Sequence, residues 1–108
     1  MLSELDRLRQ ALISISDNVY HYTGFGATPP YIVWAEDNEP SSVQGDNKKV
    51  NQTIEGTIDL YTKTEDDPLI EDIQGVLCDY EISFRLNSVY YEDETELIHF
   101  EWVFQVGC

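Results

Sequence analysis

The sequence predicts an α+β fold: a two-layer domain with a four-stranded, mainly antiparallel sheet and two helices on one face, in the order α-β-β-α-β-β. Two segments repeat their apolar residues at three- and four-residue steps, as amphipathic helices do. Other segments alternate apolar and polar residues or are rich in β-branched and aromatic residues, as strands are. With 108 residues, of which 42% are apolar, the chain predicts a single domain over residues 1–108 with one core.

The first predicted helix covers residues 3–16, and Asp17 and Asn18 end it. Its apolar residues share one face: Leu5, Leu8, Leu12 and Ile15. The second helix is predicted over 68–78, because an aspartate stands at the N-cap position and Pro68 at the first helical position. Gly75 inside this helix costs about 1 kcal/mol relative to alanine. The apolar stripe of the second helix is made of Leu69, Ile73, Val76 and Leu77.

The first hairpin is predicted between the helices. The connector VYHYTGFGATPP leaves open a short strand near residues 19–22. The run YIVWA at 31–35 is a predicted strand with Pro30 at its entrance, and VNQTIEGTIDLYT at 50–62 is its partner. One face of the partner strand is apolar and is expected to meet the core: Val50, Ile54, Ile58 and Leu60.

The second hairpin joins YEISFRLNSVYY at 80–91 to LIHFEWVFQV at 97–106 through the acidic turn EDET. Because two helices cover only one face of a sheet, the other face is predicted to stay polar and to meet water or another subunit. The candidate residues of this polar sheet face are Glu55, Asp59, Arg85 and Glu101.

The charge of the chain is strongly negative and uneven. The formal net charge is −15, and residues 55–108 carry fourteen acids and only two bases. Such a surface repels nucleic acid and anionic membranes, and it favours basic partners or cations. We therefore expect no stable nucleic-acid binding and no membrane association. The start MLSELDRLRQ lacks the apolar run of a signal peptide, so a cytoplasmic location is expected.

Motifs for catalysis or metal binding are missing from the sequence. His21 and His99 are the only histidines, and no HExxH or CxxC spacing occurs. His99 shares a strand face with Glu101, which leaves an acid–base or metal role conceivable, but a half-exposed structural histidine is the preferred interpretation. The acidic clusters at 65–67 and 92–94 do not match an EF-hand loop. We predict no catalytic residues, no metal and no cofactor, hence no enzyme, and we interpret Cys78 and Cys108 as free thiols.

A long polar loop follows the strand at 31–35. It holds about thirteen residues, whereas hairpin loops usually have about two to five, and long loops are often functional. The adjacent lysines of this otherwise acidic chain lie in it. We expect the loop to contact a neighbouring subunit or a partner protein, through the candidate residues Asp37, Glu39, Asp46, Lys48 and Lys49.

Three stretches together resemble one family: PPYIVWAEDNE, QTIEGTIDLYTKTEDDPLIEDIQGVL and YYEDETELIHFEWVFQV. They resemble the tail-terminator, head–tail joining or minor capsid proteins of phages and prophages of Gram-positive bacteria. The resemblance covers residues 29–106. It implies an α+β protein without an active site, a structural component of the virion that is cytoplasmic during assembly. It further implies a ring, typically a hexamer, that caps the tail tube and receives the head connector.

Two other functions stay open. An acidic protein that imitates DNA and inhibits a basic nucleic-acid-binding protein would account directly for the charge. A small-molecule binding domain would need a concave pocket, for which the candidate lining residues are Tyr22, Phe25, Tyr31 and Trp34.

Overall fold

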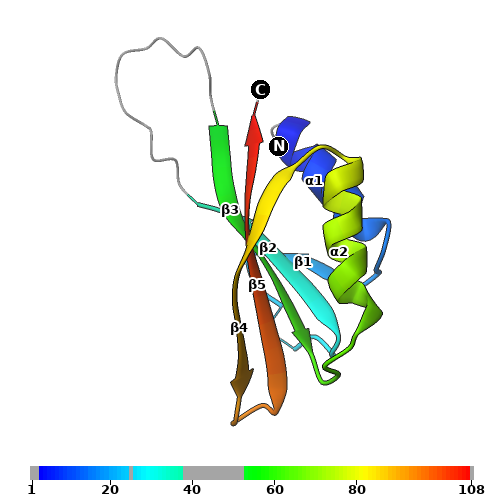
Figure 1. Cartoon of the computed structure of the whole chain (residues 1–108), viewed down its shortest axis with the longest axis vertical. Helices are drawn as coiled ribbons and strands as arrows, with labels where there is room; N and C mark the ends of the chain where they lie inside the picture. Colours follow the sequence, from blue (N-terminus) through cyan, green and yellow to red (C-terminus); the bar gives the residue numbers. More distant parts are fainter. Residues whose placement is uncertain (1–2, 25, 38–52, 108) are drawn as a thin grey trace.

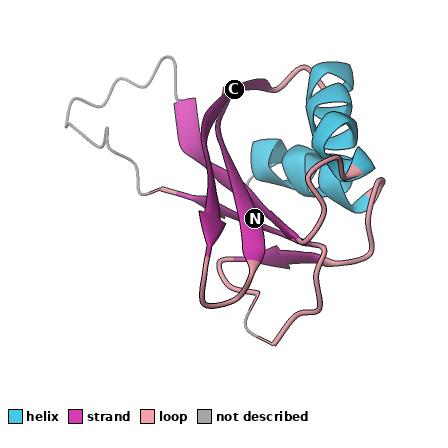
Figure 2. Ribbon diagram, turned by 60° about the horizontal axis from the view of Figure 1, so that its bottom comes forward, coloured by secondary structure: helices cyan, strands magenta, loops and turns pink. Residues whose placement is uncertain are grey.

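The computed structural model describes residues 3–24, 26–37 and 53–107, and it confirms an α+β fold. One five-stranded sheet has the strand order β1-β2-β3-β5-β4, and both helices lie against the same face of it (Figures 1 and 2). None of the helices in these ranges is long and apolar enough to cross a membrane. The elements are α1 (Ser3–Ile13), β1 (Val19–His21), β2 (Tyr31–Glu36), β3 (Thr53–Thr62), α2 (Pro68–Asp79), β4 (Ser83–Glu92) and β5 (Leu97–Gly107).

The prediction of four strands is wrong, because Val19–His21 forms a fifth. This strand pairs in parallel with β2, whereas the other three pairs are antiparallel. Two neighbouring parallel strands need a crossover connection. The connector between β1 and β2 passes over the sheet face opposite the helices. On that face, a Cβ added to Gly24 would lie 2.8 Å from the ring of Tyr31. Three residues are too few to show a period of two, so only pairing in the folded chain identifies β1 as a strand.

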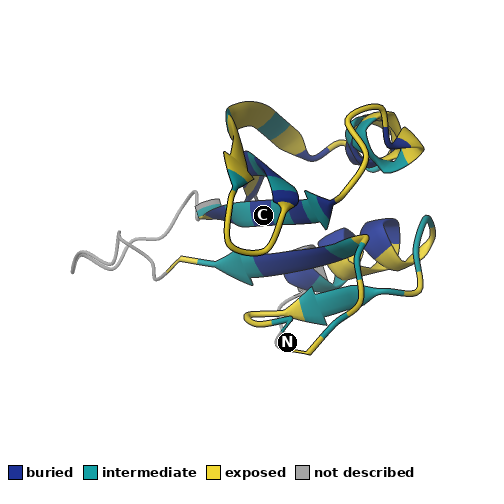
Figure 3. Cartoon of the chain, turned by 90° about the horizontal axis from the view of Figure 1, so that it is seen from below, coloured by how far each residue is buried: buried dark blue, intermediate teal, exposed yellow. Residues whose placement is uncertain are grey.

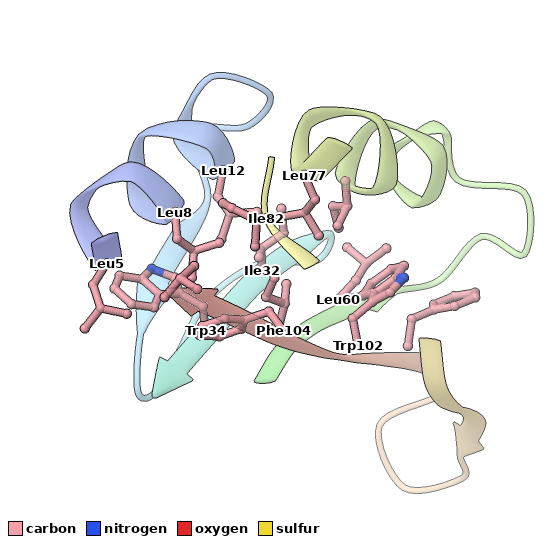
Figure 4. Packing of buried hydrophobic residues seen from close by; sticks show 14 residues of the cluster. Leu5, Leu8, Leu12, Ile32, Trp34, Leu60, Leu77, Ile82, Trp102 and Phe104 are labelled. Atoms are coloured by element: carbon pink, nitrogen blue, oxygen red, sulfur yellow. The ribbon is translucent and has the colours of Figure 1, made fainter. Parts of the chain in front are cut away.

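The core lies between the helices and the sheet (Figure 4). It confirms the predicted helix faces, although α1 ends at Ile13 rather than at residue 16. Beyond Ile13 the chain makes a turn in which the Ser14 hydroxyl donates a hydrogen bond to the Ala11 carbonyl at 2.6 Å. The largest fully buried apolar side chains come from five elements: Leu8, Leu12, Ile32, Trp34, Ile58, Leu60, Ile73, Leu77, Trp102, Phe104 and Val106.

The start of α2 follows the prediction from the sequence. The Asp67 carboxylate accepts a hydrogen bond from the Leu69 amide at 2.9 Å, which is an N-cap, and Pro68 occupies the first helical turn. The same carboxylate accepts the buried Thr62 hydroxyl at 2.6 Å, so the cap also fixes the helix to the end of β3. At the other side of the core, the Trp102 indole donates to the Gln74 side chain at 3.0 Å and links α2 to β5.

Strand β4 departs from simple alternation. Its register against β5 shifts between Leu86 and Ser88, so Asn87 is the extra residue of a β-bulge. After the bulge, Val89 and Tyr91 point to the side of the sheet on which the helices lie, because they pair with Phe100 and Ile98. Phe84 near the start of β4 packs against the core, whereas Leu86, Val89 and Tyr91 further along the strand remain exposed.

Candidate protein-interaction surface

Strand β4 is the outer strand at one edge of the sheet. Among the described residues it pairs only with β5, and it is ten residues long. The backbone amides and carbonyls of its outer edge are therefore without a strand neighbour in this part of the chain. A long free edge of this kind is a template on which another chain can add a strand.

The side chains of β4 are unusually apolar for an exposed strand. Six large apolar side chains are exposed in the described part of the chain, and four of them belong to β4: Leu86, Val89, Tyr90 and Tyr91, which are 46–55% exposed. Figure 3 shows β4 mostly in the colours of exposed and intermediate residues. Because apolar side chains scattered singly are normal but clusters are not, this concentration makes β4 a candidate interaction surface.

An open groove of about 570 Å³ lies along this strand. Its apolar floor consists of two cross-strand pairs, Val89 with Phe100 and Tyr91 with Ile98. Two acids, Glu65 and Asp66, line it from the turn that precedes α2. We call the groove and the exposed side chains of β4 the β4 surface. The groove is lined by Glu65, Asp66, Val89, Tyr90, Tyr91, Ile98 and Phe100.

Electrostatics around the β4 surface are one-sided. Beyond Glu65 and Asp66, the turn after β4 carries the acids of the sequence EDETE at residues 92–96. Arg85 is the one basic residue of β4, and its guanidinium donates a hydrogen bond to the Asn87 side chain at 3.1 Å. An apolar floor with an acidic margin has the anatomy of a protein interface for a basic partner.

A row of aromatic rings crosses the sheet face opposite the helices. The rings of Tyr31 and Tyr61 stack at 4.9 Å between centroids, and Tyr61 stacks on His99 at 4.4 Å. The strand register places these residues directly opposite one another on β2, β3 and β5, with Tyr90 next to His99 on β4. Each strand contributes a single tyrosine or histidine to the row. The row therefore cannot be recognised in the sequence until the register of the strands is known.

His99 is buried within this row, and the interpretation of a half-exposed histidine is wrong. The ring is 8% exposed because Tyr61 stacks on it and Asp59 and Tyr90 flank it. Nε2 lies 2.7 Å from the Asp59 carboxylate, which as an anion only accepts, so Nε2 carries the proton. The Tyr90 hydroxyl lies 2.8 Å from Nδ1. Both ring nitrogens of His99 thus have partners within the described residues.

Two tyrosines of the row have perturbed acidity. Burial, reinforced by the negative charge of Asp59, raises the pKa of Tyr61 far above its ordinary value. Burial and then the charge of Glu92 raise the pKa of Tyr31. Both phenols are therefore held in the neutral form near neutral pH.

The four predicted residues of the polar sheet face do not form one group. Asp59 and Glu101 face each other across β3 and β5, and Glu101 accepts hydrogen bonds from the bulge residue Asn87 at 3.1 Å and from Ser88 at 3.3 Å. Arg85 reaches this group only through Asn87. Glu55 lies further along β3 and accepts a hydrogen bond from Gln105 at 2.6 Å.

Of the predicted contact loop, the structure places only the first residue. The Asp37 amide donates to the Glu55 carbonyl at 2.7 Å and so prolongs the pairing of β2 with β3. The other candidates, Glu39, Asp46, Lys48 and Lys49, lie outside the described residues. The role of this loop stays a prediction.

The described candidates for the pocket that a small-molecule binding domain would need do not share one face of the sheet. Trp34 is buried in the core on the helix side of β2, whereas Tyr31 belongs to the opposite face. Tyr22 is exposed and Phe25 lies outside the described residues.

The second histidine, His21, lies instead in a cluster at the end of β1. Its ring stacks on Trp34 at 3.9 Å, and the Glu36 carboxylate accepts hydrogen bonds from His21 Nε2 at 2.7 Å and from the Tyr22 hydroxyl at 2.8 Å. Burial of Glu36 acts to raise its pKa, but these hydrogen bonds outweigh burial and leave the pKa below its ordinary value. The hydrogen bond to Glu36 is the main cause of a raised pKa of Tyr22.

Across the described ranges, no group of three or more histidine, cysteine or acidic side chains is placed to hold a metal ion. The thiol of Cys78 is free and exposed.

The sequence matches no protein-family profile and no curated protein. Among solved structures, the chain is similar to a mutant of the H-NOX protein of T. tengcongensis, with 18% identity and a TM-score of 0.43. It is also similar to a Cs H-NOX mutant that carries an unnatural amino acid, with 18% identity and a TM-score of 0.42. Each match covers 98% of this chain but 45% of the H-NOX chain, so the chain spans less than half of those proteins. At this level the similarity carries no functional inference.

Proposed function

We propose that this protein is a non-enzymatic assembly adaptor of a phage or prophage virion, of the tail-terminator or head–tail joining type. The observation that carries the proposal is the β4 surface, which combines a free strand edge, four exposed apolar side chains and an acidic margin. These are the parts of a protein-binding surface. The two histidines, by contrast, are engaged by Asp59 and Glu36 within the fold.

The adaptor is proposed to act as a ring, typically a hexamer, whose subunits meet through the segment that contains Lys48 and Lys49. Those lysines would face acids of the next subunit, and a head-to-tail contact of this kind closes a ring. The β4 surface would then be free to bind the tail tube or the head connector. Because each subunit carries a charge of −15, repulsion opposes the ring at low ionic strength.

Light scattering tests the ring, at low salt and at roughly physiological salt with magnesium. We expect a ring-sized species that grows with ionic strength and that is lost when residues 40–47 are deleted, while the monomer stays folded. A strict monomer under every condition, including the presence of tail tubes, contradicts the ring. Measurable affinity for DNA at physiological salt contradicts the expectation that the acidic surface leaves DNA unbound.

Electron microscopy of growing tail tubes tests the adaptor role, using the tube protein from the same gene cluster. The wild type should shorten the tubes by capping them. The double variant Leu86→Ser/Val89→Ser should lose this effect, since it removes apolar contact area from the β4 surface. Ile13→Ser is the control, because Ile13 is a similarly exposed apolar residue that lies on α1. Tubes of unchanged length with wild-type protein contradict the proposal.

The second candidate function is an acidic inhibitor that imitates DNA. The net charge favours it, and its mark would be tight binding to a nuclease or DNA-binding protein that weakens steeply with salt. A mimic must present its acids to the partner like phosphates. Here Asp59, Glu101 and Glu55 accept hydrogen bonds from His99, from Asn87 and Ser88, and from Gln105. We therefore rank this function second.

A further inference from the structure

The floor of the β4 groove has the repeat of a strand. Val89 and Tyr91 are two residues apart on the same face of β4, so their side chains are separated by about 7 Å along the strand. A strand added to the outer edge of β4 would bring its own alternate side chains past these two positions. Phe100 and Ile98 deepen the floor from the neighbouring strand. The groove therefore fits an extended segment with apolar residues at every second position.

The acidic residues at the margin of the groove favour a positively charged segment. Glu65 and Asp66 line the groove, and the residues of the 92–96 turn add further acids at the end of β4. Arg85 is the only base on the strand. Pairing β4 with the β4 of a second copy would bring equal acids together, which disfavours a second copy as the occupant. Lysine or arginine side chains on the segment would instead meet Glu65 and Asp66.

We propose that the β4 groove binds an extended basic segment of another protein, which adds as a strand to the outer edge of β4. On the side of the segment that faces the helices, apolar side chains lie beside Val89 and Tyr91, and basic side chains further along the same side lie against Glu65 and Asp66. This inference rests on the proposed function, because it names the partner chemistry of the β4 surface. The expected mark of the partner is a strand with apolar and basic side chains on the same face.

Fluorescence anisotropy with a labelled synthetic lysine–valine peptide tests the proposal, at roughly physiological salt. In this peptide every second residue is a valine or a lysine, so that both kinds share one strand face, and the residues between them are serines. Three peptides of equal length serve as comparisons. One replaces each valine with glycine, one replaces each lysine with glutamate, and one is N-methylated at every second residue to prevent strand pairing. We expect the lysine–valine peptide to bind at least about tenfold more tightly than any of them.

Variants of the protein test where the lysine–valine peptide binds. Glu65→Gln/Asp66→Asn should weaken the lysine–valine peptide about tenfold. Glu71→Gln/Asp72→Asn is the matched control, since it removes the same charge from exposed positions of α2 and should change binding less than about twofold. Val89→Ser should also weaken binding about tenfold, whereas Ile13→Ser should not. Circular dichroism and thermal unfolding establish that each variant is folded.

Three results would overturn the inference. Equal binding of the glycine or N-methylated peptide would mean that charge alone attracts it, and equal loss in both charge variants would place the binding elsewhere. A dimer that Val89→Ser dissociates, and that the peptide does not displace, would make a second copy the occupant. Light scattering of the wild type separates the two proposals: a ring that does not bind the lysine–valine peptide defeats this inference alone, and a wild type that stays monomeric even in the presence of tail tubes defeats the ring.

Discussion

Substitution by alanine is expected to have opposite effects on the stability of the protein at Gly56 and at Gly75. Gly75 lies inside α2 with an exposed position, and a Cβ added there would meet no heavy atom within 4 Å. Gly56 lies in β3, between Glu36 of β2 and Phe104 of β5. A Cβ on Gly56 would overlap the Ala35 carbonyl oxygen and lie 2.8 Å from the Phe104 ring. Alanine is therefore expected to stabilise the protein at one position and to destabilise it at the other.

The magnitudes follow from these environments. Gly75→Ala gains the difference in helix propensity, about 1 kcal/mol, with no steric penalty. Gly56→Ala forces a methyl group against backbone atoms and a fully buried ring, neither of which can move away cheaply. Overpacking of this kind costs about 1–3 kcal/mol, and contact with backbone places Gly56→Ala near 3 kcal/mol.

Thermal unfolding followed by circular dichroism measures both effects. For 108 residues the unfolding entropy is about 0.23 kcal/mol/K, so Gly75→Ala should raise Tm by about 4 °C and Gly56→Ala should lower it by about 13 °C. Urea unfolding at 25 °C should give the same signs. A Gly56→Ala protein as stable as the wild type would refute the close packing of β2, β3 and β5, and a destabilised Gly75→Ala protein would refute the open surroundings of α2.

Burial, reinforced by the negative charge of Asp59, raises the pKa of Tyr61. The neutral phenol therefore contributes fully to the stability of the fold below about pH 10, and this contribution is lost as the pH rises further. Urea unfolding between about pH 9 and pH 11 should then show a smaller loss for Tyr61→Phe than for the wild type; equal losses would contradict the shift. Hydrogen bonds lower the pKa of Glu36 in spite of burial, so its contribution is present above about pH 4.3 and is lost as the pH falls through the folded pKa. Glu36→Gln should therefore lose less stability than the wild type between about pH 5 and pH 3, and parallel curves would count against the hydrogen bonds. His99→Phe keeps the ring stack but leaves Asp59 and Tyr90 unpaired, which should cost about 2 kcal/mol in urea unfolding. Adding Asp59→Asn should cost less than the sum of the single effects, and strict additivity would show that the pair does not interact.

Periodicity predicted the helices well because both lie against one core. The spacing of Leu8 and Leu12 in α1, and of Ile73 and Leu77 in α2, reflects a single buried face, and all four side chains are fully buried. The signals that predicted the start of α2 were equally informative, because the capping hydrogen bond from the Leu69 amide to Asp67 joins neighbours in the same helix turn. These features depend on residues close together in the chain.

The features that periodicity did not predict depend on pairing between strands that are distant in the sequence. His99 becomes buried only because the register sets Tyr61 and Tyr90 beside it, and its hydrogen bond to Asp59 joins residues forty positions apart. The bulge at Asn87 reverses the alternation of β4, so residues beyond it face the other way from what a regular strand would give.

The sequence by itself determined the α+β class, the two helices, the core faces and the acidic character of the protein, because these follow from local spacing and from summed charge. Only the tertiary structure decided that β1 joins the sheet and that β4 is an outer strand with exposed apolar side chains. The physical reason is that strand order and coverage depend on contacts between distant segments, and no local pattern encodes which strand lies at the edge.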